Sequence, residues 1–131
     1  MKKEILFPAD VWDSSVYGFS QAVKVRDARE VVYISGQTAF DSQGQLVGED
    51  DVETQIRSSF ENVKRIVQAA GGDMNNVVKL TVYFLDLDAL EQYRAILREY
   101  FPDEAPSTTV VEVSRLALPG FLIEVEATAV L

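Results

Sequence analysis

The chain of 131 residues contains neither cysteine nor histidine. Without a thiol it can form no disulfide, no cysteine nucleophile and no thiolate metal site. Without an imidazole it lacks the usual general base near neutral pH and the commonest zinc ligand. Any reaction that this protein catalyses must therefore proceed without either group.

Positive charge is also scarce. The chain carries 12 lysines and arginines against 21 aspartates and glutamates, a net charge of −9, and the cations form no cluster. Nucleic acids and anionic membrane surfaces both require a basic footprint, so we expect neither as a partner. The acidic run at residues 48–51 is the one obvious candidate for a magnesium or calcium site. Its spacing does not match a calcium loop, and carboxylates are typical of the start of a helix.

Long hydrophobic runs are missing as well. No stretch approaches the ~20 apolar residues that a membrane span requires, and residues 1–7 are too short for a signal peptide. We therefore expect a cytoplasmic protein. Apolar residues make up 47% of the chain and charged residues 25%, as in ordinary globular proteins. Because no repeat or linker divides the sequence, residues 1–131 are predicted to form a single domain.

Hydrophobic periodicity predicts two long helices and five strands. The first helix begins at Asp50 or Asp51 and ends at Gly71-Gly72, while the second enters through Asp86 or Asp88 and closes before Pro102. The segment 26–30 is predicted to turn the first two strands into a hairpin. The predicted strands are residues 20–25, 31–35, 77–85, 108–114 and 122–130, and the helices are residues 52–70 and 87–101.

This order, β-β-α-β-α-β-β, predicts an α+β fold in which two helices back one face of a single sheet. Alternation along the last strand places Ile123, Val125, Ala127 and Ala129 on the helix side. Val111 and Val113 are expected to join them there. The other face is predicted to be mixed, and such a face is often covered by another subunit. Its expected members are Lys79, Thr81, Tyr83, Val110, Glu112, Leu122, Glu124, Glu126 and Thr128.

Glu124 and Glu126 lie two residues apart on one strand, so their carboxylates point to the same face. In a shielded site, one of two neighbouring carboxylates can act as a proton shuttle. Alternatively, the pair lies on a solvated or interface face and is tied to Lys79 or Arg115.

Arg94 occupies the apolar stripe of the second predicted helix, between Leu90 and Leu97. Its guanidinium must therefore snorkel to the edge of the stripe or act as a forked donor to a ligand carboxylate. Two further features point to a pocket. The segment Tyr17-Gly18-Phe19 places two aromatic residues before the first predicted strand, and Gly36 ends the second, where backbone can approach a ligand closely.

Several segments, taken in order, resemble the RidA family, which is also called YjgF or endoribonuclease L-PSP. The resemblance runs from about residue 17 to the C-terminus. The segments that carry it are Phe19-Ser20-Gln21-Ala22-Val23-Lys24, Ile34-Ser35-Gly36-Gln37, Asn62-Val63 with Gly71-Gly72, Val78-Lys79-Leu80-Thr81-Val82-Tyr83, Val111-Glu112-Val113-Ser114-Arg115-Leu116 and Ile123-Glu124-Val125-Glu126-Ala127.

The resemblance implies a chorismate-mutase-like fold and a homotrimer with clefts between its subunits. It also implies hydrolysis of reactive enamines and imines to keto acids and ammonia, with no metal or organic cofactor. In active family members an arginine binds the substrate carboxylate, a glutamate handles water, and the Ser-Gly-Gln turn offers backbone contacts. Ser35 and Gly36 match that turn.

Position by position, this chain departs from the family pattern. The family arginine falls on Thr108, and the family tyrosine on Phe19, with Tyr17 two residues away. A helix asparagine falls on Arg94, while the glutamate is present as Glu124. Losing one charge-assisted contact of ~1.5–3 kcal/mol would weaken binding by about one to two decades. Arg94 is a candidate to restore the missing cation.

Three functions remain open at this point. The first is a divergent imine or enamine deaminase in which Glu124 orients water and Arg94 pairs with an acidic group. The second is a binding or sensing trimer without catalysis, whose pocket at Thr108, Val110 and Phe19 suits a ligand that has no carboxylate. The third, a ribonuclease, is disfavoured by the negative charge and the absence of histidine.

Overall fold

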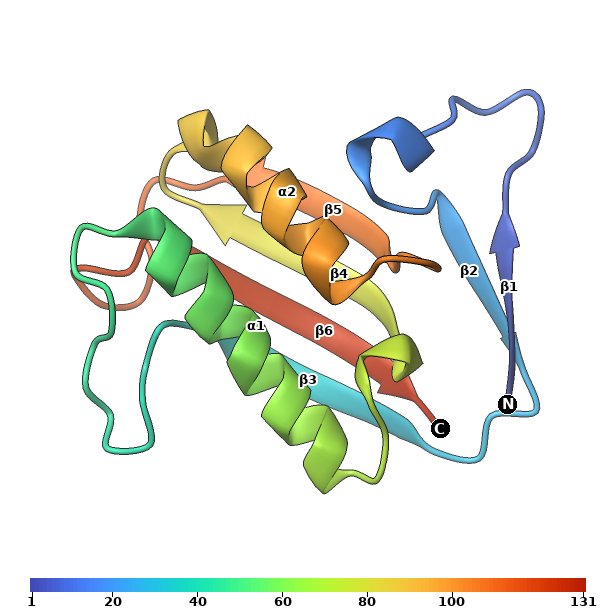
Figure 1. Ribbon diagram of the computed structural model, residues 1–131, viewed down its shortest axis with the longest axis horizontal. Helices are drawn as coiled ribbons and strands as arrows, with labels where there is room; N and C mark the ends of the chain where they lie inside the picture. The colour runs from blue at the N-terminus through green and yellow to red at the C-terminus, as the bar shows by residue number, and fades with distance from the viewer.

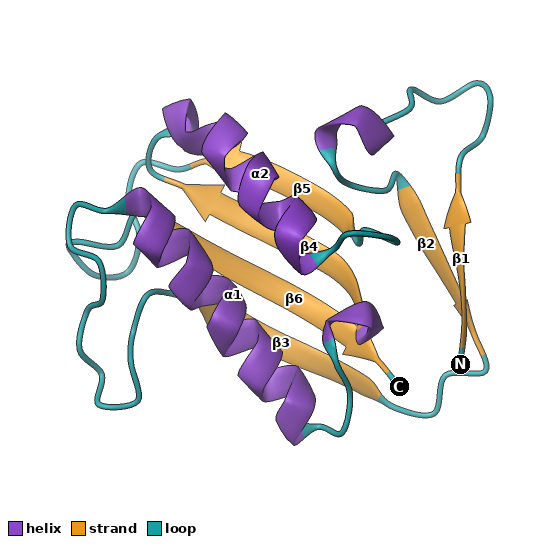
Figure 2. Ribbon diagram, viewed as in Figure 1, coloured by secondary structure: helices purple, strands orange, loops and turns teal.

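A computed structural model describes residues 1–131 as a four-stranded sheet with two helices on one face (Figures 1 and 2). An N-terminal hairpin stands beside one end of that sheet. The strands are β1 (Lys2–Leu6), β2 (Ala22–Arg26), β3 (Val31–Gln37), β4 (Val77–Phe84), β5 (Ser107–Glu112) and β6 (Ile123–Val130). The helices are α1 (Val52–Ala69) and α2 (Leu90–Tyr100), with 3-10 turns η1 (Ser15–Tyr17), η2 (Met74–Asn76) and η3 (Leu87–Ala89). No helix has the length and apolar character of a membrane span.

The strand order in the main sheet is β3-β6-β4-β5. β6 pairs antiparallel with both of its neighbours, whereas β4 and β5 are parallel. A parallel pair requires a crossover connection, and α2 supplies it. The predicted α+β fold with two helices on one face of the sheet is confirmed, and β3 and β5 form its two edges.

Local sequence explains why α1 begins where it does. Asp51 is its N-cap, and the Asp51 carboxylate accepts hydrogen bonds from the Thr54 backbone N–H at 3.2 Å and the Thr54 hydroxyl at 2.7 Å. These bonds hold the pKa of Asp51 below its ordinary value. The acidic run at 48–51 therefore starts a helix, as its composition indicates. At the other end Gly71 adopts a φ of 93°, a left-handed conformation that suits glycine.

The core lies between the two helices and the sheet. It is a single cluster of 17 buried residues drawn from α1, α2 and the four strands of the main sheet. Aromatic rings fill its centre, where Phe60 of α1 stacks near Tyr93 and Tyr100 of α2, at centroid distances of 6.1 and 5.0 Å. Burial of these rings fixes α2 over β4 and so positions the residues at its outer face.

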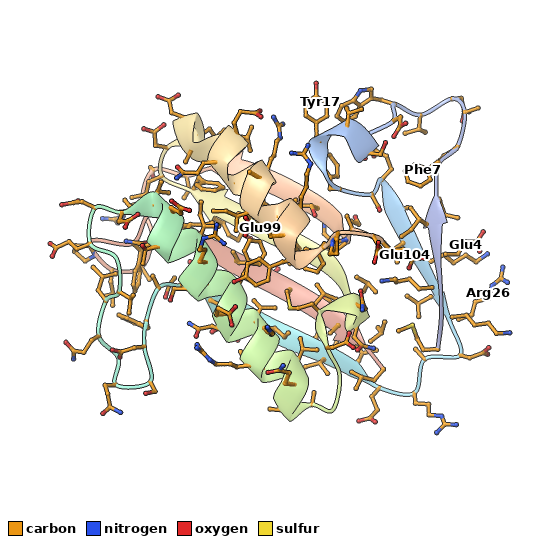
Figure 3. All side chains as sticks on the ribbon, viewed as in Figure 1. Glu4, Phe7, Tyr17, Arg26, Glu99 and Glu104 are labelled. Carbon is orange, nitrogen blue, oxygen red and sulfur yellow. The ribbon has the colours of Figure 1, made fainter.

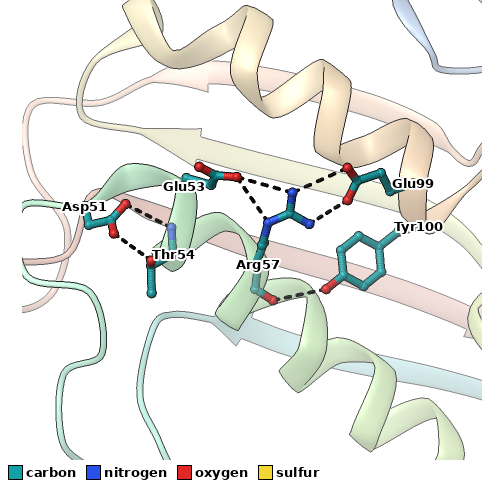
Figure 4. Close-up of polar contacts among 6 residues, drawn as sticks. All are labelled: Asp51, Glu53, Thr54, Arg57, Glu99 and Tyr100. Atoms are coloured by element: carbon teal, nitrogen blue, oxygen red, sulfur yellow. Dashed lines mark hydrogen bonds and ion pairs between the residues drawn. The ribbon is translucent and has the colours of Figure 1, made fainter.

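Polar contacts also join the two helices on their solvent side (Figure 4). Arg57 of α1 reaches Glu99 of α2 at 2.5 Å and Glu53 at 3.3 Å. The hydrogen bond from Arg57 holds the pKa of Glu99 below its ordinary value. The Tyr100 hydroxyl donates to Glu61 at 2.8 Å, and partial burial together with this bond raises the pKa of Tyr100 to about 12.

Tyr93 provides a test of this packing. Its side chain is 1% exposed, yet its hydroxyl has no hydrogen-bond partner, and burial raises the pKa of Tyr93. Because an unsatisfied buried hydroxyl costs about 1–3 kcal/mol, Tyr93→Phe is expected to increase the free energy of unfolding in urea by about 1 kcal/mol. Tyr100→Phe is the control and should lower that energy, because it removes a satisfied bond. A loss of stability in Tyr93→Phe would contradict the conclusion that the Tyr93 hydroxyl lacks a hydrogen-bond partner.

Two sequence predictions about the sheet are wrong in detail. In β5 it is Val110, not Val111, that packs against the core, while Val111 is 38% exposed. Glu112 also lies on the helix side, since its carboxylate accepts a hydrogen bond of 3.1 Å from the Leu87 backbone N–H. The run Thr-Thr-Val-Val-Glu-Val offers apolar residues on both faces, so alternation alone does not determine which side is buried.

The predicted hairpin between the strands at 20–25 and 31–35 is also wrong. β2 pairs with β1, a strand that sequence patterning did not identify, and it makes no ladder with β3. The intervening turn is fastened to the C-terminus instead, because Arg29 and Glu30 donate backbone hydrogen bonds to the Leu131 carbonyl at 2.7 and 3.1 Å. The β1–β2 pair therefore forms a second, two-stranded sheet.

Candidate functional site

A cavity of about 230 Å³ lies where the N-terminal arm meets α2 and β5. Five of the candidate residues line it: Tyr17 and Phe19 from the arm, Arg94 from α2, and Thr108 and Val110 from β5. The structure thus brings together residues that are up to 93 positions apart in the chain. The remaining lining residues are Trp12, Leu87, Leu90, Tyr93 and Leu97, so the wall is mainly apolar.

Arg94 contributes the cavity's only cation. Its side chain is 20% exposed, its guanidinium lies 4.4 Å from the centre of the Tyr17 ring, and it pairs with Glu91 one turn earlier in α2. A cation over an aromatic face is attracted to the ring's electron density. The guanidinium is therefore held at the cavity wall instead of extending freely into solvent, and it presents a forked donor there.

The arm segment that carries Tyr17 and Phe19 is anchored by buried serines. The Ser14 hydroxyl donates to the Phe19 carbonyl at 2.8 Å, and the Ser20 hydroxyl donates to the Ala105 carbonyl at 2.6 Å. Both serines are at least 96% buried. Arg98 of α2 adds a bond of 2.7 Å to the Val16 carbonyl. These contacts hold the aromatic segment against α2 and the start of β5.

Thr108 lines the cavity, but its hydroxyl has no free proton to donate to a ligand. Its hydroxyl donates to the Pro106 carbonyl at 3.1 Å, which leaves only its lone pairs for a ligand. Val110 beside it adds a branched apolar surface. This part of the wall therefore offers shape and apolar contact but no donor to a carboxylate.

Ser35, Gly36 and Glu124 form a second group on the β3–β6 pair. The ladder is irregular between Ile34 and Gln37, a β-bulge that places Gly36 against the Glu124 side chain. A Cβ at position 36 would overlap the Glu124 carboxyl group, so only glycine allows this approach. The carboxylate of Glu124 thus lies along exposed backbone at the end of β3.

The environment of Glu124 tests one part of the alternative interpretation, the tie to a lysine or arginine. Neither Lys79 nor Arg115 makes an ion pair with it, since the Lys79 ammonium donates to the Thr109 hydroxyl at 3.0 Å. Glu124 is half-buried, whereas Glu126 is exposed. The predicted tie to a lysine or arginine is therefore absent, and Glu124 keeps its oxygens free beside the bulge.

The two groups of candidate residues do not meet within one chain. β3 and β5 are separated by two intervening strands, hence by three spacings or about 14 Å. They also lie on different faces, because Thr108 and Val110 face the helices while Glu124 faces away from them. Each group therefore holds only part of the predicted set of site residues.

Sequence reasoning missed Trp12 as part of this site. It is the only tryptophan in the chain, and its ring lies 5.3 Å from Tyr17 and 6.2 Å from Phe19 between centroids. Its position five residues before Tyr17 was a usable signal, since large aromatics near one another in sequence often pack together. No group of three or more carboxylates that could hold a metal ion is present.

Comparisons with known proteins identify relatives along nearly the whole chain. The family model for "Endoribonuclease L-PSP" matches residues 13–131. A RutC family protein of Pyrococcus horikoshii is 35% identical over 127 residues, covering 97% of each chain. The 2-iminobutanoate/2-iminopropanoate deaminase of Mus musculus is 40% identical over 114 residues, covering 86% of this chain and 80% of the mouse protein.

Solved structures agree with these matches. A protein of unknown function from the Rid family of Yersinia pestis, YyfB, superposes with a TM-score of 0.92 at 31% identity and covers 100% of both chains. RidA from an Antarctic Psychrobacter superposes with a TM-score of 0.72 at 34% identity, covering 87% of this chain and 89% of that one.

Proposed function

Because the chain belongs to the endoribonuclease L-PSP family, also known as RidA or YjgF, we propose that it is a cofactor-free imine deaminase. It acts as a homotrimer that binds a small molecule in clefts between its subunits. There it hydrolyses reactive imines or enamines to a carbonyl compound and ammonia. The relatives whose names record this activity on 2-imino acids support the reaction class.

The observation that carries the proposal is the division of the candidate residues into two incomplete groups. One edge of the sheet offers an apolar cavity with a single arginine, and the other offers a free carboxylate beside exposed backbone. A neighbouring copy would bring the β5 edge of one subunit to the β3 edge of the next. The uncovered mixed face of the sheet, where Tyr33 is 82% exposed, supports such an assembly.

In this mechanism Glu124 accepts a hydrogen bond from a water molecule and aims its oxygen at the carbon of the C=N bond. Addition of water gives a carbinolamine, which loses ammonia as the C–N bond breaks and leaves a carbonyl group. Glu124 passes one proton of the water to the imine nitrogen as the C–O bond forms. It then passes the hydroxyl proton of the carbinolamine to the same nitrogen as the C–N bond breaks, so no external acid is needed. Backbone groups at Ser35 and Gly36 hold the substrate during these steps.

Arg94 is proposed to bind an acidic group of the substrate. It is the only cation on the cavity wall, and the position of the family arginine is occupied by Thr108. The ring of Tyr17 orients the guanidinium, while Phe19 and Val110 contact the apolar part of the ligand. Substrates with bulky apolar side chains are therefore favoured over small ones.

Arg94→Ala is expected to raise KM for a 2-imino acid about tenfold to a hundredfold, because it removes one charge-assisted bond of ~1.5–3 kcal/mol. The kcat should change less, since the arginine does not contact the reacting carbon. Arg57→Ala, an arginine of α1 that lines neither this cavity nor the pocket at Gly36, is the control and should leave KM unchanged. An unaltered KM in Arg94→Ala would remove Arg94 from the site.

The proposal is tested by generating imines with an amino-acid oxidase in the presence of semicarbazide, which traps them. Addition of the protein should accelerate keto-acid release and reduce semicarbazone formation, most strongly for aromatic and branched substrates. Equal semicarbazone yields with and without the protein, across small and bulky imines, would contradict enzymatic hydrolysis.

A second candidate is a binding or sensing trimer without catalysis. Thr108 in place of a cation and the mainly apolar cavity favour it. It predicts ligand-induced increases in melting temperature without any faster loss of imine. The name endoribonuclease suggests a third activity. The net charge of −9 leads us to expect that any RNA cleavage disappears when the protein is purified further. That result would exclude a ribonuclease activity.

A further inference from the structure

The N-terminal arm, residues 1–26, has no part in the hydrophobic core. None of the 17 core residues lies before Ile34, and the only buried residues of the arm are Ser14 and Ser20. An isolated two-stranded hairpin is marginally stable in water. Figure 3 shows Glu4 and Arg26 on the side of the hairpin that faces away from the body, and Phe7 is 54% exposed. Within the chain the β1–β2 pair is therefore held by polar contacts, such as those of Lys3 with Asn75 and Glu104, and not by the hydrophobic core.

Exposed apolar side chains concentrate in two places. Of the ten large hydrophobic residues that are exposed, six belong to residues 1–17 and two, Val31 and Tyr33, belong to β3. Both places also carry an open strand edge, since β2 pairs only with β1 and β3 pairs only with β6. An exposed edge flanked by apolar side chains is a template for another strand.

The connection between β2 and β3 leads the chain away from a pairing of these edges. Asp27 has a φ of 56°, a left-handed conformation that redirects the backbone directly after β2. Glu30 both donates to and accepts from Leu131, at 3.1 and 2.9 Å, which continues the pairing of β3 with β6. The arm therefore leaves at an angle and is anchored near η2 and β5, where the Lys3 ammonium donates to the Asn75 carbonyl at 2.7 Å.

Charge favours the same contact with another copy. β1 and β2 together contain four cations and one carboxylate, a net charge of +3, on a chain whose net charge is −9. A basic hairpin is therefore attracted to the acidic remainder of a second copy. Complementary charge of this kind accelerates association and disfavours pairing of two identical hairpins.

We propose that the arm is exchanged between copies of this chain: β2 of one subunit pairs antiparallel with the free edge of β3 in the next. Each subunit then has a six-stranded sheet whose outer two strands come from a neighbour. The contact joins two different edges, so it is head-to-tail, and a threefold rotation closes it into a ring of three copies. This inference rests on the proposed assembly of several copies, and it names the contact that links them.

The exchange also determines which chain supplies the aromatic residues of the site. Tyr17 and Phe19 stay on the Arg94 cavity of their own chain while β2 extends to the neighbour, so the arm spans the boundary between two subunits. The arm is included in the match to the Yersinia protein, which covers 100% of this chain, so its placement is shared with a relative of known structure.

Cross-linking tests the exchange, because the chain has no cysteine of its own. Lys24 of β2 and Tyr33 of β3 are exposed and equally distant from the turn, so they face each other whenever the two strands pair. A chain with Lys24→Cys is unfolded and refolded together with a longer, tagged chain with Tyr33→Cys, and a short bis-maleimide is added. The expected product joins one short and one long chain. The pair Lys24→Cys and Gln43→Cys is the control and should not cross-link.

The double variant Lys24→Cys/Tyr33→Cys is expected to give covalent dimers and trimers. Cross-linking confined to single chains would show an ordinary hairpin and overturn the exchange, as would no cross-linking at all. Light scattering on the uncross-linked protein distinguishes a failure of the strand exchange from a failure of the proposed trimer. A trimer with only intrachain cross-links leaves the proposed function intact, whereas a monomer at micromolar concentration contradicts the proposed trimer as well.

Discussion

Replacing Glu124 by glutamine is expected to reduce kcat for imine hydrolysis at least about a hundredfold, the usual contribution of a positioned general base. The amide keeps the size of the carboxylate and can still contact the backbone near Gly36, so the cleft keeps its shape. It cannot accept a proton from water, however, and this chain has no histidine or cysteine to take over that task. The expected result is a fall in kcat with KM changed less than threefold.

Glu126→Gln is the matched control. It lies on the same strand and the same face, two residues further along, but it is exposed and does not contact Gly36. Its activity should stay within about twofold of the parent protein, since this exposed carboxylate is screened by solvent and does not contact the water molecule that Glu124 holds. Equal losses in the two variants would indicate a general electrostatic effect and would remove Glu124 from its catalytic role.

The elements predicted correctly from sequence are those in which one physical signal dominates. α1 combines a single apolar stripe with the Asp51 cap and a glycine stop, and β6 alternates between buried and outward residues from Ile123 to Ala129. β5 lacks such a signal because adjacent valines suit either face. The predicted hairpin between residues 20–25 and 31–35 was wrong for another reason. Its turn could fold back, but hydrogen bonds from Arg29 and Glu30 to Leu131, 100 or more residues away in sequence, direct the chain elsewhere.

In the candidate site, too, one part could be predicted from the sequence and another part could not. Residue patterns and the resemblance together selected Tyr17, Phe19, Arg94, Thr108 and Val110, and all five line one cavity. Periodicity alone had left Arg94 undecided between snorkelling and facing a pocket. The Tyr17 ring and Glu91 settle that it lines the cavity, and neither contact is visible in the spacing of helix residues. In the proposed trimer this cavity meets Glu124 of a second copy, and no pattern within one chain encodes such a contact.

Gly36→Ala is expected to lower kcat for imine hydrolysis about tenfold to a hundredfold without unfolding the protein. The added methyl group would overlap the carboxyl group and the γ-carbon of Glu124, so that side chain must swing to another rotamer. Displacing a catalytic group by about 1 Å can reduce a rate about a hundredfold. Gly36 does not have a positive φ, so alanine introduces no backbone strain and the melting temperature should change little.

A double-mutant cycle decides whether Gly36 acts through Glu124. If the methyl group matters only because it moves the carboxylate, Gly36→Ala should have almost no further effect on kcat in a Glu124→Gln background, so the two effects are strongly non-additive. If the two losses multiply instead, the glycine contributes on its own, for example by admitting the substrate to the backbone of β3. The cycle thus separates positioning of the carboxylate from direct contact with the ligand, the two roles that the close approach at this bulge allows.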